Sequence, residues 1–269
     1  MHRSTGRLWL IAGTGEGPPL AEALVGAGWR LRVSVVTQAA ARAYAARPGL
    51  EIAVGAIGVR QPGVSDQLRA AAAAGDPFRW VIDASHPFAM AIRGDLSDSC
   101  RQLQQPLLRL ERPRPDPAPF EQTLGDLAEL QGCCRPGEHL LLAIGARHLA
   151  EACRRSAPAL HHARILPRPE ALRLALAAGL PAERVALLQP RPQGPEGTPL
   201  ERALCRRWRI ETILCRGSGG PPELQWRRVA AELGLRLLLL QRPQGAGTHA
   251  EVLGYEALLR RLGVGPSAD

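Results

Sequence analysis

Short runs of consecutive apolar residues alternate along the chain with Ala- and Leu-rich stretches of helical character. Continuous apolar runs are typical of strands buried on both faces of a parallel sheet. The repeated strand–helix–strand order predicts a doubly wound α/β fold with right-handed crossovers. In the first 112 residues, strands are predicted at Leu8–Ala12, Leu31–Val36, Glu51–Val54, Trp80–Asp83 and Leu107–Leu110, and helices at about 18–27, 39–46, 64–74 and 89–104.

A proline-rich stretch then interrupts the pattern. Pro113, Pro115, Pro117 and Pro119 exclude both helix and central strand, so residues 113–119 are predicted to be an extended linker. The linker would separate an N-terminal domain of residues 1–112 from a C-terminal domain of residues 120–269.

The strand–helix pattern restarts after the linker. Strands are predicted at 140–144, 162–166, 185–188, 210–215 and 235–240, and helices at about 147–155, 170–178, 199–208, 222–233 and 252–262. A Pro/Gly-rich loop at 189–199 separates two of these elements. We therefore expect two Rossmann-like doubly wound domains with the active site in the cleft between them, because ligands of such sheets bind beyond the carboxyl ends of the strands.

Composition adds a strong basic bias. The chain of 269 residues has 34 basic and 25 acidic residues, for a net charge of +9, and every basic residue other than histidine is arginine. Arginine matches carboxylate and phosphate oxygens, so small polyanions are suitable partners, although a general Arg-for-Lys bias fits equally well. Because no basic run is interleaved with aromatic residues, we do not expect nucleic-acid binding.

The six cysteines show no Cys-x-x-Cys spacing, so no metal site is predicted. We see neither a signal-peptide pattern nor an apolar stretch of membrane-spanning length. The expectation is a cytoplasmic protein with reduced thiols, acting as a monomer or small homo-oligomer.

The first chemical motif follows the first predicted strand. Gly13, Thr14, Gly15 and Glu16 lead into a helix, and such glycines let the backbone approach a diphosphate at a helix N-terminus. The dinucleotide fingerprint is incomplete because its third glycine position is Pro18. An ordinary tight turn is the alternative, but the place in the first β-α unit favours a cofactor loop.

The end of the second strand indicates which nicotinamide cofactor binds. NAD enzymes usually carry an acidic residue there, whereas residues 34–38 are Ser-Val-Val-Thr-Gln, followed by Arg42. Thr37 and Arg42 suit a ribose 2′-phosphate, so NADPH is predicted over NADH. Arg42 could equally be a solvated helix residue.

The second motif, Asp83-Ala-Ser-His-Pro-Phe-Ala89, follows the fourth strand. Pro87 keeps His86 extended, Ser85 can cap the next helix, and His86 can donate a hydrogen bond or carry a proton. Ser85 and His86 are therefore the candidate catalytic residues. The alternative is a capping turn with an exposed histidine.

Two loops of the second half are candidate anion sites. Arg216, Ser218, Gly219 and Gly220 follow a late strand, where backbone amides could form a nest beside the arginine. A second, weaker candidate is the turn at Gly145 and Arg147. A flexible glycine-rich connector is the alternative for the late loop.

These motifs together resemble the precorrin-6A reductase family, which includes the cobalt-precorrin-6A reductases. The resemblance covers about residues 8–243 and rests mainly on His-Pro-Phe-Ala at 86–89 and Leu-Glu-Arg-Pro at 110–113. It implies two Rossmann-like domains, a reduced nicotinamide cofactor, and reduction of one double bond in an acidic tetrapyrrole. It also implies that Gly13–Glu16 bind the cofactor, that 85–87 line the reaction cleft, and that 218–220 line it from the other domain.

This chain departs from the family at two loops. The first loop begins Ala12-Gly13-Thr14 where the family usually has Gly-Gly-Thr. The late loop has Arg216 where the family usually has lysine, which keeps the charge but removes a proton donor. The alternatives are another NADP-dependent oxidoreductase and a non-catalytic nucleotide-binding module.

Overall fold

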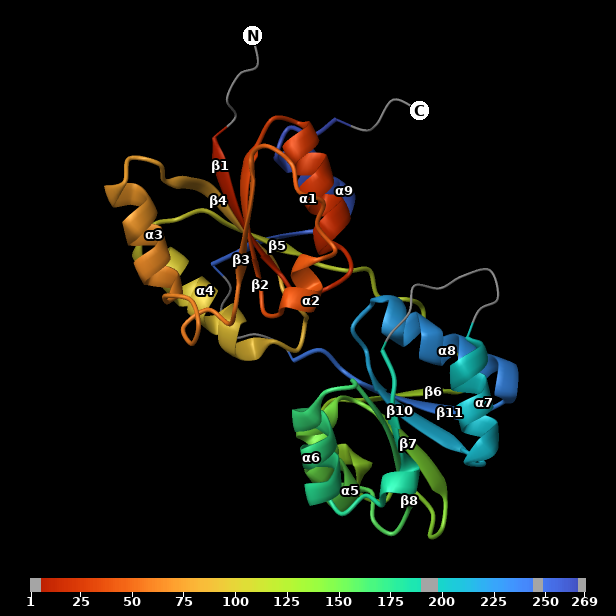
Figure 1. Ribbon diagram of the computed structural model, residues 1–269. Helices are drawn as coiled ribbons and strands as arrows, with labels where there is room; N and C mark the ends of the chain where they lie inside the picture. The colour runs from red at the N-terminus through yellow and green to blue at the C-terminus, as the bar shows by residue number, and fades with distance from the viewer. Residues whose placement is uncertain (1–5, 190–197, 244–248, 266–269) are drawn as a thin grey trace. The chain divides into compact units, whose positions relative to one another are not determined.

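The computed structural model describes residues 6–189, 198–243 and 249–265, which fall into two compact units (Figure 1). The first unit contains the described residues up to Pro113 together with residues 249–265, and the second contains those from Arg114 to Pro243. Each unit has its own parallel sheet covered by helices, which confirms the expected pair of Rossmann-like α/β domains. Residues 190–197 of the predicted Pro/Gly-rich loop lie outside the described residues.

The sheet of the first unit has the strand order β12-β5-β4-β1-β2-β3, and all of its pairings are parallel. The chain builds outward from β1 to β3, then returns to the other side of β1 with β4. The carboxyl ends of β1 and β4 therefore form the switch point where such sheets bind ligands. The strands are β1 (Arg7–Ala12), β2 (Arg30–Val35), β3 (Leu50–Val54), β4 (Phe78–Ala84), β5 (Leu107–Leu110) and β12 (Glu251–Leu253). The helices are α1 (Gly17–Gly26), α2 (Gln38–Ala41), α3 (Val64–Ala73), α4 (Met90–Gln102) and α9 (Tyr255–Arg261).

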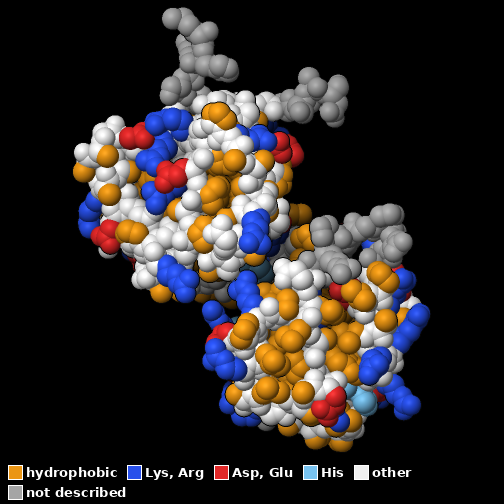
Figure 2. All heavy atoms as spheres, in the orientation of Figure 1, with side chains coloured by type: hydrophobic (Ala, Val, Ile, Leu, Met, Phe, Trp, Pro, Cys, Tyr) orange, Lys and Arg blue, Asp and Glu red, His pale blue; other side chains and the backbone are white. Residues whose placement is uncertain are grey.

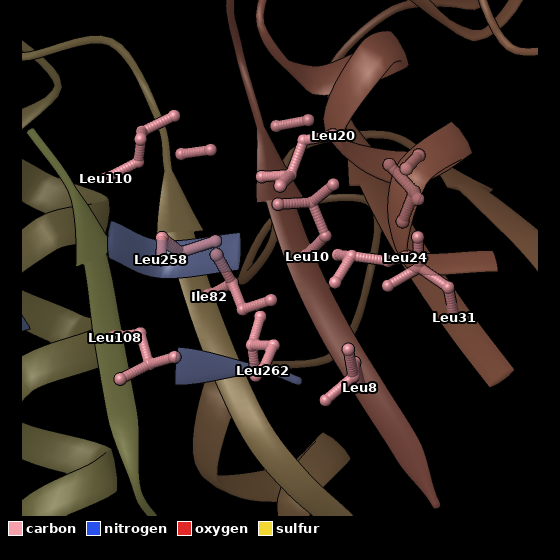
Figure 3. Close-up of a cluster of buried hydrophobic side chains, with 14 of the residues drawn as sticks. Leu8, Leu10, Leu20, Leu24, Leu31, Ile82, Leu108, Leu110, Leu258 and Leu262 are labelled. Atoms are coloured by element: carbon pink, nitrogen blue, oxygen red, sulfur yellow. The ribbon is translucent and has the colours of Figure 1, made fainter. Parts of the chain in front are cut away.

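Strand β1 is buried on both faces, which explains its continuous apolar sequence. Leu8 and Leu10 pack on the side of α1 and α9, as Figure 3 shows. Trp9 and Ile11 point the other way and pack against α3 and α4. Each fully buried side chain of this size contributes roughly 1.5–3 kcal/mol, so this strand anchors both layers of the unit.

The second unit repeats this architecture, with the strand order β6-β11-β10-β7-β8-β9 and parallel pairing throughout. Leu141, Ile213 and Leu237 pack under Trp226 and Val229 of α8. Its strands are β6 (Glu121–Leu124), β7 (His139–Ala143), β8 (Leu160–Ile165), β9 (Val185–Leu187), β10 (Thr212–Arg216) and β11 (Arg236–Leu240). Its helices are α5 (Leu149–Arg155), α6 (Pro169–Ala177), α7 (Pro199–Arg207) and α8 (Pro221–Leu233), with short 3₁₀ turns at η1 (Ala128–Leu130), η2 (Ala146–His148) and η3 (Ala182–Arg184).

The chain crosses from the first unit to the second and then returns, so the first unit is built from two separate stretches of sequence. After β5 the chain leaves the first unit and forms β6, which pairs with β11 of the second. After β11 it returns to the first unit and forms β12, which pairs with β5. Residues 249–265 therefore belong to the first unit, whereas they were expected in a second domain of residues 120–269. Leu258 and Leu262 are buried in the first unit, and Trp29 Nε1 donates to the Leu262 carbonyl at 3.0 Å.

Two local predictions were wrong. Residues 251–253 form an edge strand where the start of a helix at 252 was predicted. Helix α2 has four residues instead of the predicted span 39–46. After Arg42 the amides of Ala43 and Tyr44 donate to carbonyls three residues back, so the chain continues in turns, and Tyr44 lies against Gly17 of α1.

The surface charge and the lengths of the helices bear on possible partners. On the face shown in Figure 2, arginine side chains are scattered among apolar and acidic ones in both units. Across the described residues, no helix is both long and apolar enough to cross a membrane.

Candidate functional site

The glycine loop after β1 and the Ser-His-Pro loop after β4 lie side by side. Ala12 and Ala84 are register partners at the ends of these strands. Thr14 Oγ1 donates to the Ala84 carbonyl at 3.4 Å. A Cβ added at Gly13 would lie 3.3 Å from the backbone nitrogen of His86, so glycine permits the close approach. The structure thus brings together the two loops that the sequence predicts to bind the cofactor and to carry the catalytic residues.

The loop leaves an open side at Gly15 and closes tightly at Gly17. A Cβ added at Gly15 would meet nothing within 4 Å, so ligand atoms can approach the backbone there. At Gly17 a Cβ would collide with the Tyr44 hydroxyl and lie 3.0 Å from the Ala12 Cβ. Burial raises the pKa of Tyr44 to about 12, which keeps the phenol neutral. Gly17, which the sequence analysis did not assign, is therefore required for packing of α1.

Glu16 of this loop is neutralised by an arginine from the far end of the domain. Arg112 Nε lies 2.6 Å from Glu16 Oε1, and Arg112 Nη2 donates to Oε2 at 3.0 Å. Burial alone would raise the pKa of Glu16, but the hydrogen bond with Thr14 and the Arg112 charge together lower it. Glu16 is thus a charged residue paired with Arg112, and its expected cofactor contact stays a prediction.

A buried ion pair supports the second loop from below. Asp83 is 1% exposed; its Oδ2 accepts from Arg109 Nε at 3.0 Å and lies 3.8 Å from Arg93 Nε. Its Oδ1 accepts from the Ser85 backbone N–H at 3.0 Å. A single carboxylate therefore holds two arginines and the start of the loop. Neither arginine is part of a motif that the sequence pattern marks, although the pairing of β4 with β5 sets Asp83 opposite Arg109.

Within the loop, Ser85 and His86 differ in their hydrogen bonding. Ser85 Oγ is buried and finds no partner in the described parts of the chain. Ser85 was expected to cap the next helix. It does not, because α4 begins after Ala89, four residues further along the chain. His86 Nδ1 accepts from the Phe88 backbone N–H at 3.2 Å, which leaves Nε2 as the ring atom that carries a proton. Pro87 is buried between them and Phe88.

The polar residues at and after the end of β2 have different surroundings. Ser34 points into the core, where its Oγ accepts from Trp9 Nε1 at 3.0 Å and donates to Gln61 at 3.2 Å. Thr37 caps α2 by accepting from the Ala40 backbone N–H at 3.2 Å. Arg42 follows α2 and is exposed. The contact of Thr37 and Arg42 with a ribose 2′-phosphate therefore stays a prediction; Thr37 lies shortly after β2, which pairs with β1.

In the second unit, cations gather at the equivalent edge. Gly145, with φ of +86°, follows β7, and a Cβ there would lie 3.5–3.7 Å from the Arg216 guanidinium at the end of β10. Burial and the charge of Arg147 lower the pKa of Arg216. Burial and the charge of Arg216 lower the pKa of His148. Arg147 is exposed and forms no ion pair within the described ranges, so this edge has the potential to attract an anion.

The late glycine loop is built differently from the expected nest. The amides of Gly217, Ser218 and Gly219 donate to Leu240 O, Arg216 O and Glu223 Oε2, respectively. The nest prediction is wrong for these three amides because they already have partners. Glu223 is 3% exposed and also accepts from Arg227 Nε at 2.8 Å. Arg216 therefore supplies the charge of this loop, and residues 217–219 supply its shape.

Comparisons with known proteins agree with this geometry. The family described as "Precorrin-6x reductase CbiJ/CobK" matches residues 7–262. A cobalt-precorrin-6A reductase of Synechocystis is 32% identical over 252 residues, covering 91% of each chain. A precorrin-6A reductase of Rhodococcus erythropolis is 29% identical, covering 88% of this chain and 89% of its own.

A solved structure of CobK precorrin-6A reductase has a TM-score of 0.72 and 23% identity, covering 98% of this chain and all of the other, which supports the fold. The family match spans both units. It includes the loops after β1 and β4 in the first unit and those after β7 and β10 in the second. This chain therefore belongs to the precorrin-6x reductase family.

Proposed function

We propose that the protein uses NADPH to reduce a carbon–carbon double bond of precorrin-6A or of its cobalt-containing form. The observation that carries this proposal is the meeting of the Gly13–Gly15 loop with Ser85 and His86 at the switch point of a dinucleotide-type sheet. Because the chain belongs to a family of reductases, we assign a reduction to this site. The relatives named above act on the two forms of the substrate.

The first unit fits a nicotinamide cofactor. Gly13 and Gly17 pack the loop tightly, while Gly15 leaves open space beside the N-terminus of α1, where a diphosphate is favoured. Thr14 fixes the loop to β4, and Arg112 removes the repulsion that Glu16 would exert on phosphate. Pro87, which is buried next to His86 in the sequence, is a further proposed cofactor contact. A bound nicotinamide would supply the hydride.

NADPH is favoured over NADH by the groups at the end of β2. An acidic residue that would bind the ribose hydroxyls is absent from residues 34–42, which the structure describes in full. Thr37 offers a hydroxyl and Arg42 an exposed guanidinium, which together suit a 2′-phosphate.

The second unit fits an acidic substrate. Arg147 and Arg216 lie at neighbouring strand ends, and arginine forks recognise carboxylates. Gly145 leaves room for the Arg216 guanidinium, and Ser218, Gly219 and Gly220 shape the adjoining loop. The two guanidinium groups repel each other when no anion is bound. A bound carboxylate would be attracted to both and would offset that repulsion.

Reduction of a double bond also needs a proton. His86 is the candidate donor and would act as an imidazolium. Nδ1 would then have to bind a proton in place of the hydrogen bond that it accepts from Phe88, so that loss of the Nε2 proton leaves a neutral ring. The Asp83 carboxylate fixes the loop that carries His86 through the Ser85 amide. Ser85 Oγ lacks a partner among the described residues and would gain one from a ligand atom.

The test is oxidation of NADPH by the purified full chain, measured anaerobically with precorrin-6A and in parallel with its cobalt-containing form. Turnover with either substrate supports the proposal and identifies the form used. A lack of oxidation with both, in a preparation that binds NADPH, would refute it.

A further inference from the structure

The two crossings between the units use the same short motif. Strand β5 is followed by Glu111-Arg112-Pro113 and strand β11 by Gln241-Arg242-Pro243. The two strands occupy equivalent places, because each is the second strand from the edge of its sheet: β5 lies between β12 and β4, and β11 lies between β6 and β10. Each arginine is the second-last residue of its segment before the chain passes to the other unit. Neither arginine takes part directly in the hydride or proton transfer proposed above.

Both arginines are buried against a ligand loop of their own unit. Arg112 is 9% exposed and Arg242 is 8% exposed. Arg112 forms the two-pronged ion pair with Glu16 of the cofactor loop. Arg242 Nε donates at 3.0 Å to the carbonyl oxygen of Gly217 in the late glycine loop. Burying a guanidinium costs free energy unless it is paired. We therefore attribute the burial of each arginine to the contact that it makes with its loop.

We propose that Arg112 and Arg242 are positioning residues, Arg112 for the NADPH loop and Arg242 for the substrate loop. This inference rests on the proposed function. Neither residue touches reacting atoms; each acts through the loop that it holds.

The electrostatic reason is clearest for Arg112. Glu16 lies at the N-terminus of α1, directly before the helix whose positive end would receive the cofactor diphosphate. Its side chain makes no capping hydrogen bond to the helix, so the carboxylate is held by Thr14 and Arg112. Without Arg112, an uncompensated negative charge would remain beside an anionic ligand.

For Arg242 the reason is geometric. The Gly217 amide donates to Leu240 O at 2.8 Å, and a Cβ at Gly217 would lie 3.2 Å from that same oxygen. The loop is therefore pressed against the end of β11, and Arg242 closes the contact by binding the Gly217 carbonyl. Loss of this clamp frees the loop that carries Arg216.

The experiment measures the dissociation constant of NADPH by fluorescence titration and the KM of the tetrapyrrole, using the full chain and the variants Arg112→Met, Glu16→Gln, Glu16→Gln/Arg112→Met and Arg242→Met. Arg47→Met is the matched control, because Arg47 also pairs with a residue at α1, Glu22, at 3.0 Å but on the exposed surface. Thermal unfolding of each variant shows whether it is folded.

We expect Arg112→Met to weaken NADPH binding about tenfold or more, with Arg47→Met within about threefold of the parent chain. The double variant should recover most of the loss, because removing Glu16 removes the repulsion. Arg242→Met should raise the KM of the tetrapyrrole and leave NADPH binding unchanged. Recovery in the double variant also separates positioning from a general loss of stability.

The inference is overturned if Arg112→Met binds NADPH as the parent chain does, or if Arg112→Met and Arg242→Met weaken both ligands equally. If the parent chain itself binds no NADPH, the proposed function fails first, and that outcome is read directly from the unmodified protein.

Discussion

Arg109 and Asp83 face each other across β5 and β4, with Arg109 Nε 3.0 Å from Asp83 Oδ2 and both side chains at most 4% exposed. The other oxygen of Asp83 holds the Ser85 backbone amide. The pair therefore connects the sheet interior to the loop that carries His86. A buried pair of this kind stabilises a defined loop conformation as long as both partners are present.

Replacing Asp83 should be strongly destabilising. Asp83→Asn leaves Arg109 and Arg93 without their shared carboxylate, and breaking a buried pair costs about 3–5 kcal/mol. Denaturant unfolding of the first unit measures this loss. Glu22→Gln, which breaks an exposed ion pair on α1, is the control and should have little effect. A loss below about 1 kcal/mol for Asp83→Asn would show that the pair contributes little.

Gly17 should not tolerate a larger residue while Tyr44 is present. Gly17→Ala places a Cβ against the Tyr44 hydroxyl, and overpacking of this kind costs about 1–3 kcal/mol. Tyr44→Phe in the same chain should restore part of the stability because it removes the colliding oxygen. Thermal unfolding of the two single variants and the double variant measures the coupling. Additive effects of the two substitutions would contradict the predicted contact.

Arg42 should determine the preference for NADPH. Arg42→Met is expected to lower kcat/KM with NADPH about tenfold, equivalent to about 1.4 kcal/mol, while kcat/KM with NADH changes little. Steady-state kinetics with both cofactors measure the ratio. An equal fall with the two cofactors would indicate that Arg42 does not contact the 2′-phosphate.

His86 should affect turnover more than cofactor binding. His86→Ala removes the Nε2 proton donor, and loss of general acid catalysis lowers kcat by roughly 100-fold or more. The NADPH dissociation constant should stay within about threefold, equivalent to about 0.7 kcal/mol. Unchanged kcat at saturating substrate would assign the proton transfer to another group or to solvent.

Acid should destabilise the second unit through His162. This ring is 3% exposed, its Nε2 lies 3.0 Å from His139 Nδ1, and it packs 4.8 Å from the Trp208 ring. Burial, followed by the charges of His139, Arg184 and His161, lowers the pKa of His162 to about 4 from 6.5. Below pH 6.5 the unfolded chain binds a proton that the folded chain rejects, so stability falls until about pH 4.

His162→Phe tests this because it retains a ring next to Trp208 but cannot titrate. The free energy of unfolding of this variant should depend less on pH between 6.5 and 4 than that of the parent chain. Identical pH profiles would rule out His162 as the cause.

The sequence predicted the central strands of both sheets because each is a continuous apolar run, as β1 and β7 illustrate. It missed β6 and β12, which are edge strands of four and three residues with exposed polar positions such as Gln122 and Glu251. Their pairing joins segments that lie more than 100 positions apart, from β6 to β11 and from β5 to β12. Local patterns contain no signal for such partners.

The same distinction holds for the site. Gly13, Thr14, Ser85 and His86 follow predicted strands, so their meeting at one sheet edge could be expected from topology. The ion pair of Glu16 with Arg112 joins residues 96 positions apart, and Glu223 reaches the late loop from within α8. These contacts depend on three-dimensional register, which the sequence pattern alone does not specify.

The most direct test of the central claim is the fate of the transferred hydride. The full chain is incubated with precorrin-6A, or its cobalt form, and NADPH stereospecifically deuterated on one or the other face of the nicotinamide, and the product is analysed by mass spectrometry. The proposed reduction predicts one deuterium in the product from one of the two labelled cofactors and one hydrogen from solvent. A product without deuterium from either cofactor, or unchanged substrate, would contradict it.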